Sequence, residues 1–283
     1  MAVKLSTIRA FLEELYPLDW AEDWDRVGLV AGDPDQTISH IRLAVDPTVA
    51  EANAAAQNTE TLLLTHHPLL LRPVSFLTTE TGKGAVITKL IQSGGALWCG
   101  HTNSDRSRAG TVGAWIDALQ LKKAAPLVAP QTNEQVGDSK LFGMGVVADL
   151  PAKTTVVGLA RQIADIVPAT AQGVLYTGSG DREVGRIAVC PGAGDSLLET
   201  VSQLDVDAYI TSDLRHHPTL EHIESRANAL AVPALLDLPH YASEFIYLES
   251  LAKMLRSEFP TVTTEVSAIS SNPFTGRVDK SVN

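Results

Sequence analysis

Six imidazole and carboxylate side chains are placed along the sequence in a way that suits metal binding. Two adjacent histidines follow the apolar run "TLLLT", and two His-x-x-Ser-acid motifs, "HTNSD" and "HYASE", come later in the chain. The candidate metal ligands are His66, His67, His101, Asp105, His240 and Glu244. Imidazole nitrogen mixed with carboxylate oxygen suits zinc, iron or manganese, whereas calcium prefers oxygen ligands alone. The set therefore predicts a transition-metal site.

The number of candidate ligands favours two divalent ions over one. Six ligands exceed what one tetrahedral ion requires and would leave open positions on two ions. Two ions about 3.5–4 Å apart can share a carboxylate and a hydroxide that acts as the nucleophile. Each residue alone has a plainer interpretation: a solvated turn for His66 and His67, a core histidine for His101, a solvated helix face for Glu244. Taken together, the six favour a metal centre.

A twofold repeat of elements must position these side chains. The segment "IRLAVDPT" from Ile41 matches "GRIAVCPG" from Gly185, and each is followed by a helical pattern, a short apolar strand and His-His-Pro. A second helical pattern, a third strand and the His-x-x-Ser-acid motif complete each half. The order strand, helix, strand, helix, strand predicts an α/β fold of two similar lobes, with right-handed crossovers and mostly parallel strands.

The loops at the carboxyl ends of parallel strands are where open α/β sheets bind ligands. We therefore expect a metal cleft between two lobes that are related by a pseudo-two-fold axis. The segment "APLVAPQTNEQVGDSK" is rich in Pro, Gln, Asn and Gly and is expected to link the lobes. The expected division is an N-terminal lobe at 1–125, a linker at 126–140, a C-terminal lobe at 141–274 and a tail at 275–283.

Composition limits the classes of partner and the compartment. The net charge of −11 and the pI near 5.1 argue against a nucleic-acid-binding surface or an anionic membrane partner. The start of the chain reads as an amphipathic helix rather than a signal peptide, and no apolar run is long enough to span a bilayer. Only Cys99 and Cys190 are present, which excludes a disulfide framework and predicts a cytoplasmic protein with two buried, inert thiols.

Two further stretches could bind a substrate. In "DRSRAG", Arg106 and Arg108 follow a candidate ligand, and their planar guanidinium groups suit phosphate. Gly110 would let the backbone approach a ligand. The amino end of the helix that starts after Gly110 would add backbone N–H donors. The alternative is that both arginines are solvated or pair with acids across a subunit interface. In "AEDWDRVGLVAGD", Trp24 could line a pocket, or the stretch could be a packed turn. The histidines of the second His-His-Pro region (His216, His217 and His222) could surround the metals or lie at the surface.

Several motifs resemble those of the Nif-three-like family, the GTP cyclohydrolase 1 type 2 homologues. They are "AEDWDRVGL", "THHPLLL", "HTNSD", "GRIAVCPG", "TSDLRHH" and "HYASE". The resemblance covers about Leu5 to Phe274. It implies a two-lobed α/β fold, a dinuclear centre on the six ligands above with Glu244 as the bridge, and a toroidal homohexamer built as a trimer of dimers. Arg26, Ser104 and the run "AGTVGA" depart from the family pattern and leave the ligands intact.

Two functions from different classes fit these features. The first is a metal-dependent hydrolase of a nucleotide-like or phosphorylated small molecule, in which hydroxide attacks a purine ring carbon, an amide or a phosphoester. The candidate catalytic residues are Glu244, as a ligand of the metal centre, and His217, as general acid or base. The second is a non-enzymatic metal-binding, metal-delivery or assembly protein. Open coordination positions favour the enzyme, whereas fully ligated ions with no adjoining pocket favour the binding protein.

Overall fold

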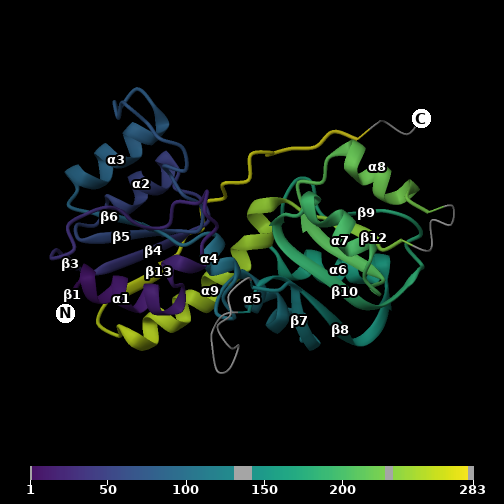
Figure 1. Ribbon diagram of the computed structural model, residues 1–283. Helices are drawn as coiled ribbons and strands as arrows, with labels where there is room; N and C mark the ends of the chain where they lie inside the picture. Colours follow the sequence, from purple (N-terminus) through teal and green to yellow (C-terminus); the bar gives the residue numbers. More distant parts are fainter. Residues whose placement is uncertain (1, 131–141, 227–231, 280–283) are drawn as a thin grey trace. The chain divides into compact units, whose positions relative to one another are not determined.

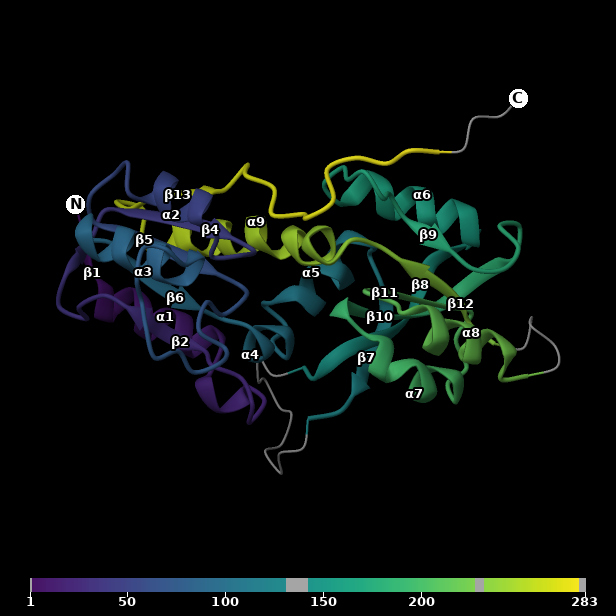
Figure 2. The same ribbon diagram turned by 90° about the horizontal axis from the view of Figure 1, so that it is seen from above.

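The computed structural model describes residues 2–130, 142–226 and 232–279, which fall into two compact units. The first unit consists of Met1–Gly110 and Tyr247–Ser271, and the second consists of Thr111–Ile246 and Asn272–Asn283. Figures 1 and 2 label the elements of each unit. The sequence placed the expected lobes at 1–125 and 141–274, whereas in the structure the chain returns to the first unit at Tyr247.

The first unit is an α/β unit built on a five-stranded sheet in the order β13-β4-β5-β6-β2. All its neighbouring strands are parallel except β2, which runs antiparallel to β6. A separate antiparallel pair joins β1 to β3. The elements are β1 (Val3–Lys4), α1 (Leu5–Leu15), η1 (Leu18–Trp20), β2 (Gly28–Ala31), β3 (Thr37–Ile38), β4 (His40–Ala44), α2 (Val49–Ala55), β5 (Thr61–Thr65), α3 (Gly82–Gln92), β6 (Ala96–Cys99), α4 (Thr102–Asp105), the later part of α9 (His240–Glu258) and β13 (Thr263–Val266).

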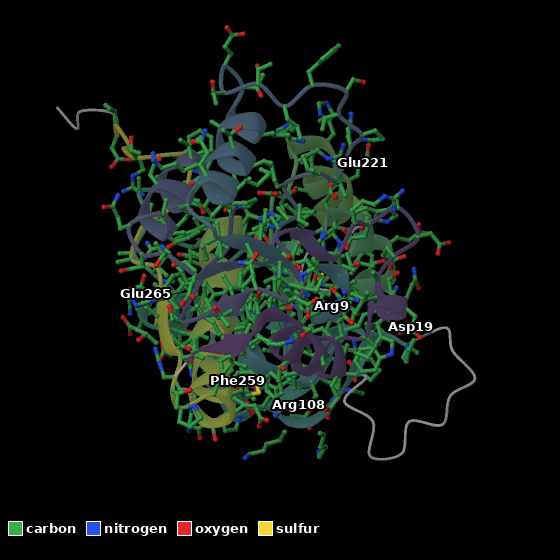
Figure 3. The ribbon with its side chains drawn as sticks, turned by 90° about the vertical axis from the view of Figure 1, so that its left-hand side faces the viewer. Arg9, Asp19, Arg108, Glu221, Phe259 and Glu265 are labelled. Carbon is green, nitrogen blue, oxygen red and sulfur yellow. The ribbon has the colours of Figure 1, made fainter. Side chains whose placement is uncertain are left out.

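Helices cover both faces of this sheet, which explains the unbroken apolar run of β5. Helices α2 and α3 lie on one face and α1 lies on the other (Figure 1). Leu63 packs with the α2–α3 side, together with Val86 and Leu90 of α3. A strand covered on both faces needs apolar side chains at every position, and all five residues of β5 are buried. Just after α9, Phe259 (labelled in Figure 3) packs edge-on against Phe11 of α1, with ring centroids 5.5 Å apart.

The second unit holds a six-stranded sheet in the order β7-β8-β10-β11-β12-β9. The pairs β10–β11 and β11–β12 are parallel, whereas β7–β8, β8–β10 and β12–β9 are antiparallel. The elements are α5 (Thr111–Ala118), β7 (Lys122–Val128), β8 (Met144–Thr155), α6 (Val156–Ile166), β9 (Leu175–Tyr176), β10 (Glu183–Ala193), η2 (Asp195–Leu197), α7 (Leu198–Ser202), β11 (Ala208–Ser212), α8 (His216–Glu224), β12 (Ala234–Asp237) and the start of α9.

Strict alternation along β10 builds two cores in this unit. Ile187 and Val189 pack with helices α5 and α6, whereas Ala188 and Cys190 pack with α7 on the other face. Helix α6 begins at a threonine cap, because the Thr155 side chain accepts a hydrogen bond from the Gly158 N–H at 3.1 Å. Both cysteines are buried, and burial raises the pKa of the Cys99 thiol, as expected for inert side chains.

The expected order of elements is present, with two corrections. The segments β4-α2-β5-α3-β6 and β10-α7-β11-α8-β12 each supply three neighbouring parallel strands. The expectation of mostly parallel strands is wrong for the second sheet, where antiparallel pairs outnumber parallel ones. Of the expected linker at 126–140, residues 126–128 belong to β7, and residues 131–140 lie outside the described residues. None of the described helices is long and apolar enough to cross a membrane.

Candidate metal centre

Three histidines of the first unit bring their ring nitrogens together. His66 and His67 directly follow β5, and His101 follows β6, the next parallel strand of the sheet. One nitrogen from each of the three lies within 4.8 Å of the other two. The ring centroids are 5.0 to 5.4 Å apart. The carboxyl ends of two adjacent strands thus form the histidine cluster, as the sequence predicted.

Each ring in the histidine cluster is oriented through its Nδ1 atom. The Nδ1–H of His67 donates to Asp46 Oδ1 at 2.7 Å, and that of His101 donates to Asp25 Oδ1 at 2.9 Å. The Nδ1–H of His66 donates to the Gly100 carbonyl at 3.0 Å. Because each acceptor fixes the proton on Nδ1, the lone pair of each ring is on Nε2. This arrangement is typical of histidines that bind a metal through Nε2.

Asp25 is one of the orienting acids that are not among the site residues predicted from the sequence. Its side chain is buried and accepts hydrogen bonds from the Thr102 N–H at 3.0 Å and the Thr102 hydroxyl at 2.5 Å. Burial opposes its ionisation, but the bonds from His101 and Thr102 outweigh burial and lower the pKa of Asp25. The neighbouring Trp24 is 55% exposed and lies edge-on to His101, with ring centroids 5.9 Å apart. Asp25, the residue after Trp24, therefore fixes the orientation of the His101 ring.

Short helix α4 adds a carboxylate to this group. Asp105 is buried, and its Oδ1 lies 3.7 Å from His66 Nε2. Ser104, which replaces a hydrophobic residue of the family pattern, donates to the His101 carbonyl at 2.7 Å and lies 3.3 Å from His66 Nδ1. Ser104 therefore places a hydroxyl next to Nδ1, the atom through which the His66 ring is oriented.

The arginine loop after α4 differs from the expectation at two positions. Arg106 donates to the Trp20 carbonyl at 2.9 Å and pairs with Glu22, so an acid of the same unit already binds its guanidinium. Gly110 packs against the loop's own backbone: a Cβ there would lie 1.7 Å from the Ser104 carbonyl oxygen. Gly110 is thus required by the fold rather than by the approach of a ligand. Arg108 is exposed and is labelled in Figure 3.

The second unit contains a histidine–carboxylate pair in the first turns of α9. His240 Nε2 lies 2.9 Å from Glu244 Oε1, because residues four apart share a helix face. His240 Nδ1–H donates to Asp213 Oδ2 at 2.7 Å. Glu244 is buried. The pair repeats the device of the histidine cluster: an acid on Nδ1 orients the ring, and Nε2 faces a second ligand.

Gly192 makes room for this pair. The residue has φ of +71°, and a Cβ there would lie 2.5 Å from Glu244 Oε1 and 3.1 Å from His240 Nε2. Its N–H donates to the Ser243 hydroxyl at 2.9 Å, which ties strand β10 to helix α9. The sequence showed this glycine in "GRIAVCPG", where it was interpreted only as part of the strand repeat.

The histidines of α8 lie apart from these contacts. His216 and His217 are exposed at the start of the helix, with ring centroids 5.1 Å apart. The second His-His-Pro therefore begins a helix, whereas the first follows directly on a strand. His222 is buried, and its Nε2 lies 3.1 Å from the Pro233 carbonyl oxygen, which gives it a packing role. The general acid–base role of His217 stays a prediction.

These features define a mixed α/β protein with candidate histidine-rich metal sites. The model of the Duf34/NIF3 (NGG1p interacting factor 3) family matches residues 3–273, and the chain belongs to this family. A protein of Streptomyces coelicolor named GTP cyclohydrolase 1 type 2 homolog is 40% identical over 252 residues, which cover 89% of this chain and 85% of that protein.

Solved structures show the same fold. The hypothetical protein SA1388 of Staphylococcus aureus is 26% identical with a TM-score of 0.81, and the match covers 96% of this chain and 98% of that one. A Bacillus cereus protein related to NIF3 superposes with a TM-score of 0.82 over 96% of this chain and 98% of its own, at 18% identity. The expected family and the mixed α/β class are therefore confirmed.

Proposed function

We propose that this chain is a divalent-metal-dependent hydrolase that acts on a nucleotide-like or phosphorylated small molecule. The observation that carries the proposal is the histidine cluster, in which three Nδ1 atoms are held by acceptors and one nitrogen of each ring lies within 4.8 Å of the others. Three neutral imidazoles turned in this way form a donor set for zinc, iron or manganese.

The proposed ligands come from both motifs. His66, His67, His101 and Asp105 are the ligands of the first unit, and His240 and Glu244 are those of the second. From the family resemblance we take that the two groups serve one dinuclear centre, with Glu244 as the bridge. Mixed nitrogen and oxygen ligands fit this assignment, since buried carboxylates lie beside His66 and His240.

Divalent ions bound there would supply Lewis acidity and lower the pKa of water. The side chains of the protein have their own tasks. Asp25, Asp46 and Asp213 keep the histidines in the tautomer that binds metal. We assign proton transfer to the exposed His217.

The substrate class rests on two supports. The Streptomyces coelicolor relative carries the name GTP cyclohydrolase 1 type 2 homolog, and Arg106 and Arg108 closely follow the ligand Asp105. In the proposal these arginines bind the phosphate of the substrate, and Trp24 borders its base or ring. Arg106 would have to exchange its partner Glu22 for the phosphate.

A turnover screen tests this function. Metal-stripped protein is loaded separately with zinc, iron(II) or manganese and incubated with GTP, other nucleotides and simple phosphoesters. We expect release of a hydrolysis product with at least one metal, and loss of that turnover in His67→Ala. Absence of turnover in protein that carries its full metal content, together with transfer of the ions to a chelating acceptor, would replace hydrolysis by metal delivery.

We also propose that the chain assembles as a homohexamer, a trimer of dimers, which the family resemblance implies. Light scattering at micromolar concentration is expected to give six times the mass of one chain. A monomer under those conditions contradicts the proposal, and it does so independently of the turnover screen.

A further inference from the structure

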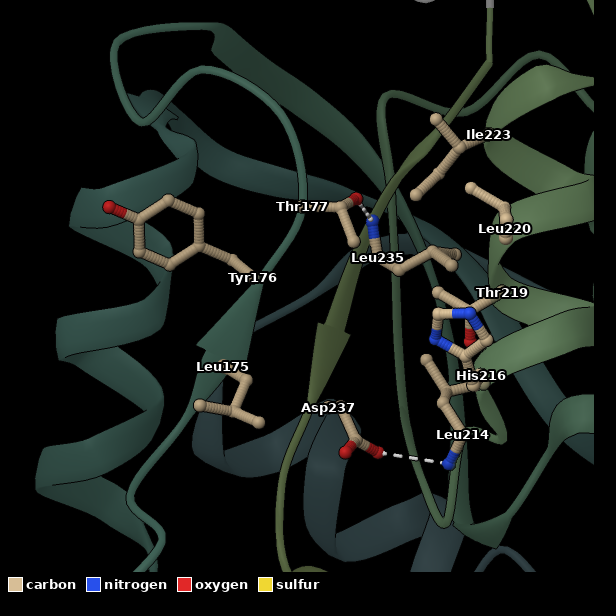
Figure 4. A pocket seen from close by; sticks show the side chains of 10 residues that line it. All are labelled: Leu175, Tyr176, Thr177, Leu214, His216, Thr219, Leu220, Ile223, Leu235 and Asp237. Atoms are coloured by element: carbon tan, nitrogen blue, oxygen red, sulfur yellow. Dashed lines mark hydrogen bonds between the residues drawn. The ribbon is translucent and has the colours of Figure 1, made fainter. Parts of the chain in front are cut away.

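The second unit contains a cavity of about 320 Å³ beside helix α8 (Figure 4). Leu175 and Tyr176 of β9 form one wall, and Leu220 of α8 lies on the other. Its volume is at the lower end of the roughly 300–1,000 Å³ typical of small-molecule sites. None of the six proposed metal ligands lines it. The cavity is therefore separate from the proposed metal ligands.

The walls of this cavity leave apolar side chains exposed. Leu175, Tyr176 and Leu220 are all exposed, although each is large and apolar. Figure 4 shows Leu175 and Tyr176 across the cavity from the side chains of α8. Apolar side chains that gather around a hollow mark a binding site more often than singly scattered ones do. A ligand with an apolar body would cover them.

The Asp237 carboxylate gives the cavity a specific chemistry. Asp237, at the end of β12, is half-buried, and its Oδ1 accepts from the Leu214 N–H at 3.3 Å. Within the described part of the chain, its Oδ2 makes no hydrogen bond. The Thr219 hydroxyl is buried and has no hydrogen-bond partner among the described residues. The Thr219 hydroxyl is enclosed by protein, so the polar group that a ligand in the cavity would meet is the Asp237 carboxylate.

The charge around Asp237 favours a positively charged ligand. Burial raises the pKa of Asp237, and the negative charge of Asp213 raises it further, against the hydrogen bond from Leu214. A cation beside the carboxylate would offset both effects. The other titratable side chains lining the cavity are His216 and Tyr176.

We propose that this cavity binds a small organic cation whose amine or amidinium head pairs with Asp237. Its apolar body lies between β9 and α8. The proposal extends beyond the metal-dependent function, because it uses none of the ligands of that function.

Methyl NMR of the full-length chain tests the proposal with defined probes. Benzamidine, benzylamine and propylamine are titrated as cations, and benzamide serves as the neutral match to benzamidine. We expect at least one cation to shift the methyl signals of Leu175, Leu220 and Ile223, and benzamidine to bind at least tenfold more tightly than benzamide. If no cation shifts these methyl signals, or benzamide binds equally well, the proposal is overturned.

Two variants and a control complete the test. Asp237→Asn keeps the side-chain shape and should weaken benzamidine at least tenfold, while Asp181→Asn removes an exposed charge of the same unit and should leave binding unchanged. Leu220→Trp, at an exposed position of α8, should fill the cavity and abolish the shifts even if Asp237→Asn fails to fold. Unchanged benzamidine affinity in folded Asp237→Asn, or in Leu220→Trp, overturns the assignment.

Discussion

The histidine cluster of the first unit and the His240–Glu244 pair of the second use one chemical device on two different scaffolds. For His67, His101 and His240, an acid distant in the chain accepts a hydrogen bond from Nδ1 and turns Nε2 toward another candidate ligand. The cluster is assembled by loops after two parallel strands. In the pair, one helix turn sets the spacing of His240 and Glu244. Long-range packing therefore orients the rings in both groups, whereas the neighbour of Nε2 is supplied by separate loops in the cluster and by helix geometry in the pair.

The two sheets show a similar contrast around their matching arginines. Arg42 of β4 pairs with Glu265 of β13 at 2.5 Å, and Arg186 of β10 pairs with Asp149 of β8 at 2.6 Å. Each arginine thus binds an acid on the strand beside the first of the three parallel strands. Strand β13 runs parallel to its neighbour, however, and β8 runs antiparallel. Both arginines therefore meet an acid on the equivalent neighbouring strand, although this strand is parallel in the first sheet and antiparallel in the second.

The largest expected effect falls on the pair, through Gly192→Ala. The new Cβ would meet the buried Glu244 carboxylate at 2.5 Å on a backbone with positive φ. We expect the free energy of unfolding to fall by about 2 kcal/mol or more, measured by urea denaturation. Gly173→Ala is the matched control, because its φ is +64° and a Cβ there meets nothing within 4 Å. Equal losses in both variants would show that φ alone, and not the pair, requires the glycine.

The next effect concerns metal content. His67→Ala removes a proposed ligand, so we expect metal affinity to fall by more than the roughly 10–100-fold that loss of an orienting partner costs. Elemental analysis after dialysis should show two equivalents per chain in the unaltered protein and fewer in the variant. His40→Ala removes a histidine of the same unit outside the cluster and should keep both. At most one equivalent in well-folded unaltered protein would contradict the dinuclear assignment.

Smaller losses are expected when the orienting acids are changed. Asp25→Asn and Asp213→Asn each keep the side-chain shape but weaken the acceptor on Nδ1, so metal affinity should fall about 10–100-fold. Only Asp25→Asn should also lower the free energy of unfolding, because Asp25 is buried with four hydrogen bonds whereas Asp213 is largely exposed. Zinc titration and urea denaturation measure the two effects. Asp35→Asn, on an exposed acid, is the control, and an Asp25→Asn variant with unaltered zinc affinity would contradict the orienting role.

Local pattern in the sequence was enough to point to the histidines and carboxylates that the structure brings together at strand ends and at the start of a helix. His66, His67 and His101 follow apolar runs, and the four-residue spacing of His240 and Glu244 is itself a helical signal. The orienting acids carry no such signal. Asp25, Asp46 and Asp213 lie within the quoted stretches "AEDWDRVGL", "IRLAVDPT" and "TSDLRHH", but only the tertiary fold shows which acid reaches which histidine.

Strand direction and close approaches were also beyond the sequence pattern. Strand β8 pairs antiparallel to β10, and the alternation of side chains along a strand is the same in either direction, so the pattern does not predict this pairing. Gly192 appeared in a quoted motif, yet the atom it approaches belongs to Glu244, far along the chain. Physical contacts of this kind depend on where whole elements pack.

The smallest expected effect distinguishes the two His-x-x-Ser-acid motifs by their neighbouring residues. Asp105 is followed by Arg106 and Arg108, whereas Glu244 is followed by Phe245 and Ile246, so only the first motif brings cations beside a ligand. Because Arg106 pairs with Glu22, we expect Arg106→Ala to lower the free energy of unfolding by about 0.5–1 kcal/mol.

Replacing both arginines by alanine should weaken phosphate binding roughly tenfold or more, since a charge-assisted pair is lost. Calorimetric titration of phosphate into metal-loaded protein measures this, with Arg9→Ala, which removes an arginine of helix α1, as the control. Unchanged phosphate affinity in the double variant, with the metals retained, would show that this loop does not bind the phosphate. The two His-x-x-Ser-acid motifs would then differ in no proposed role beyond metal binding.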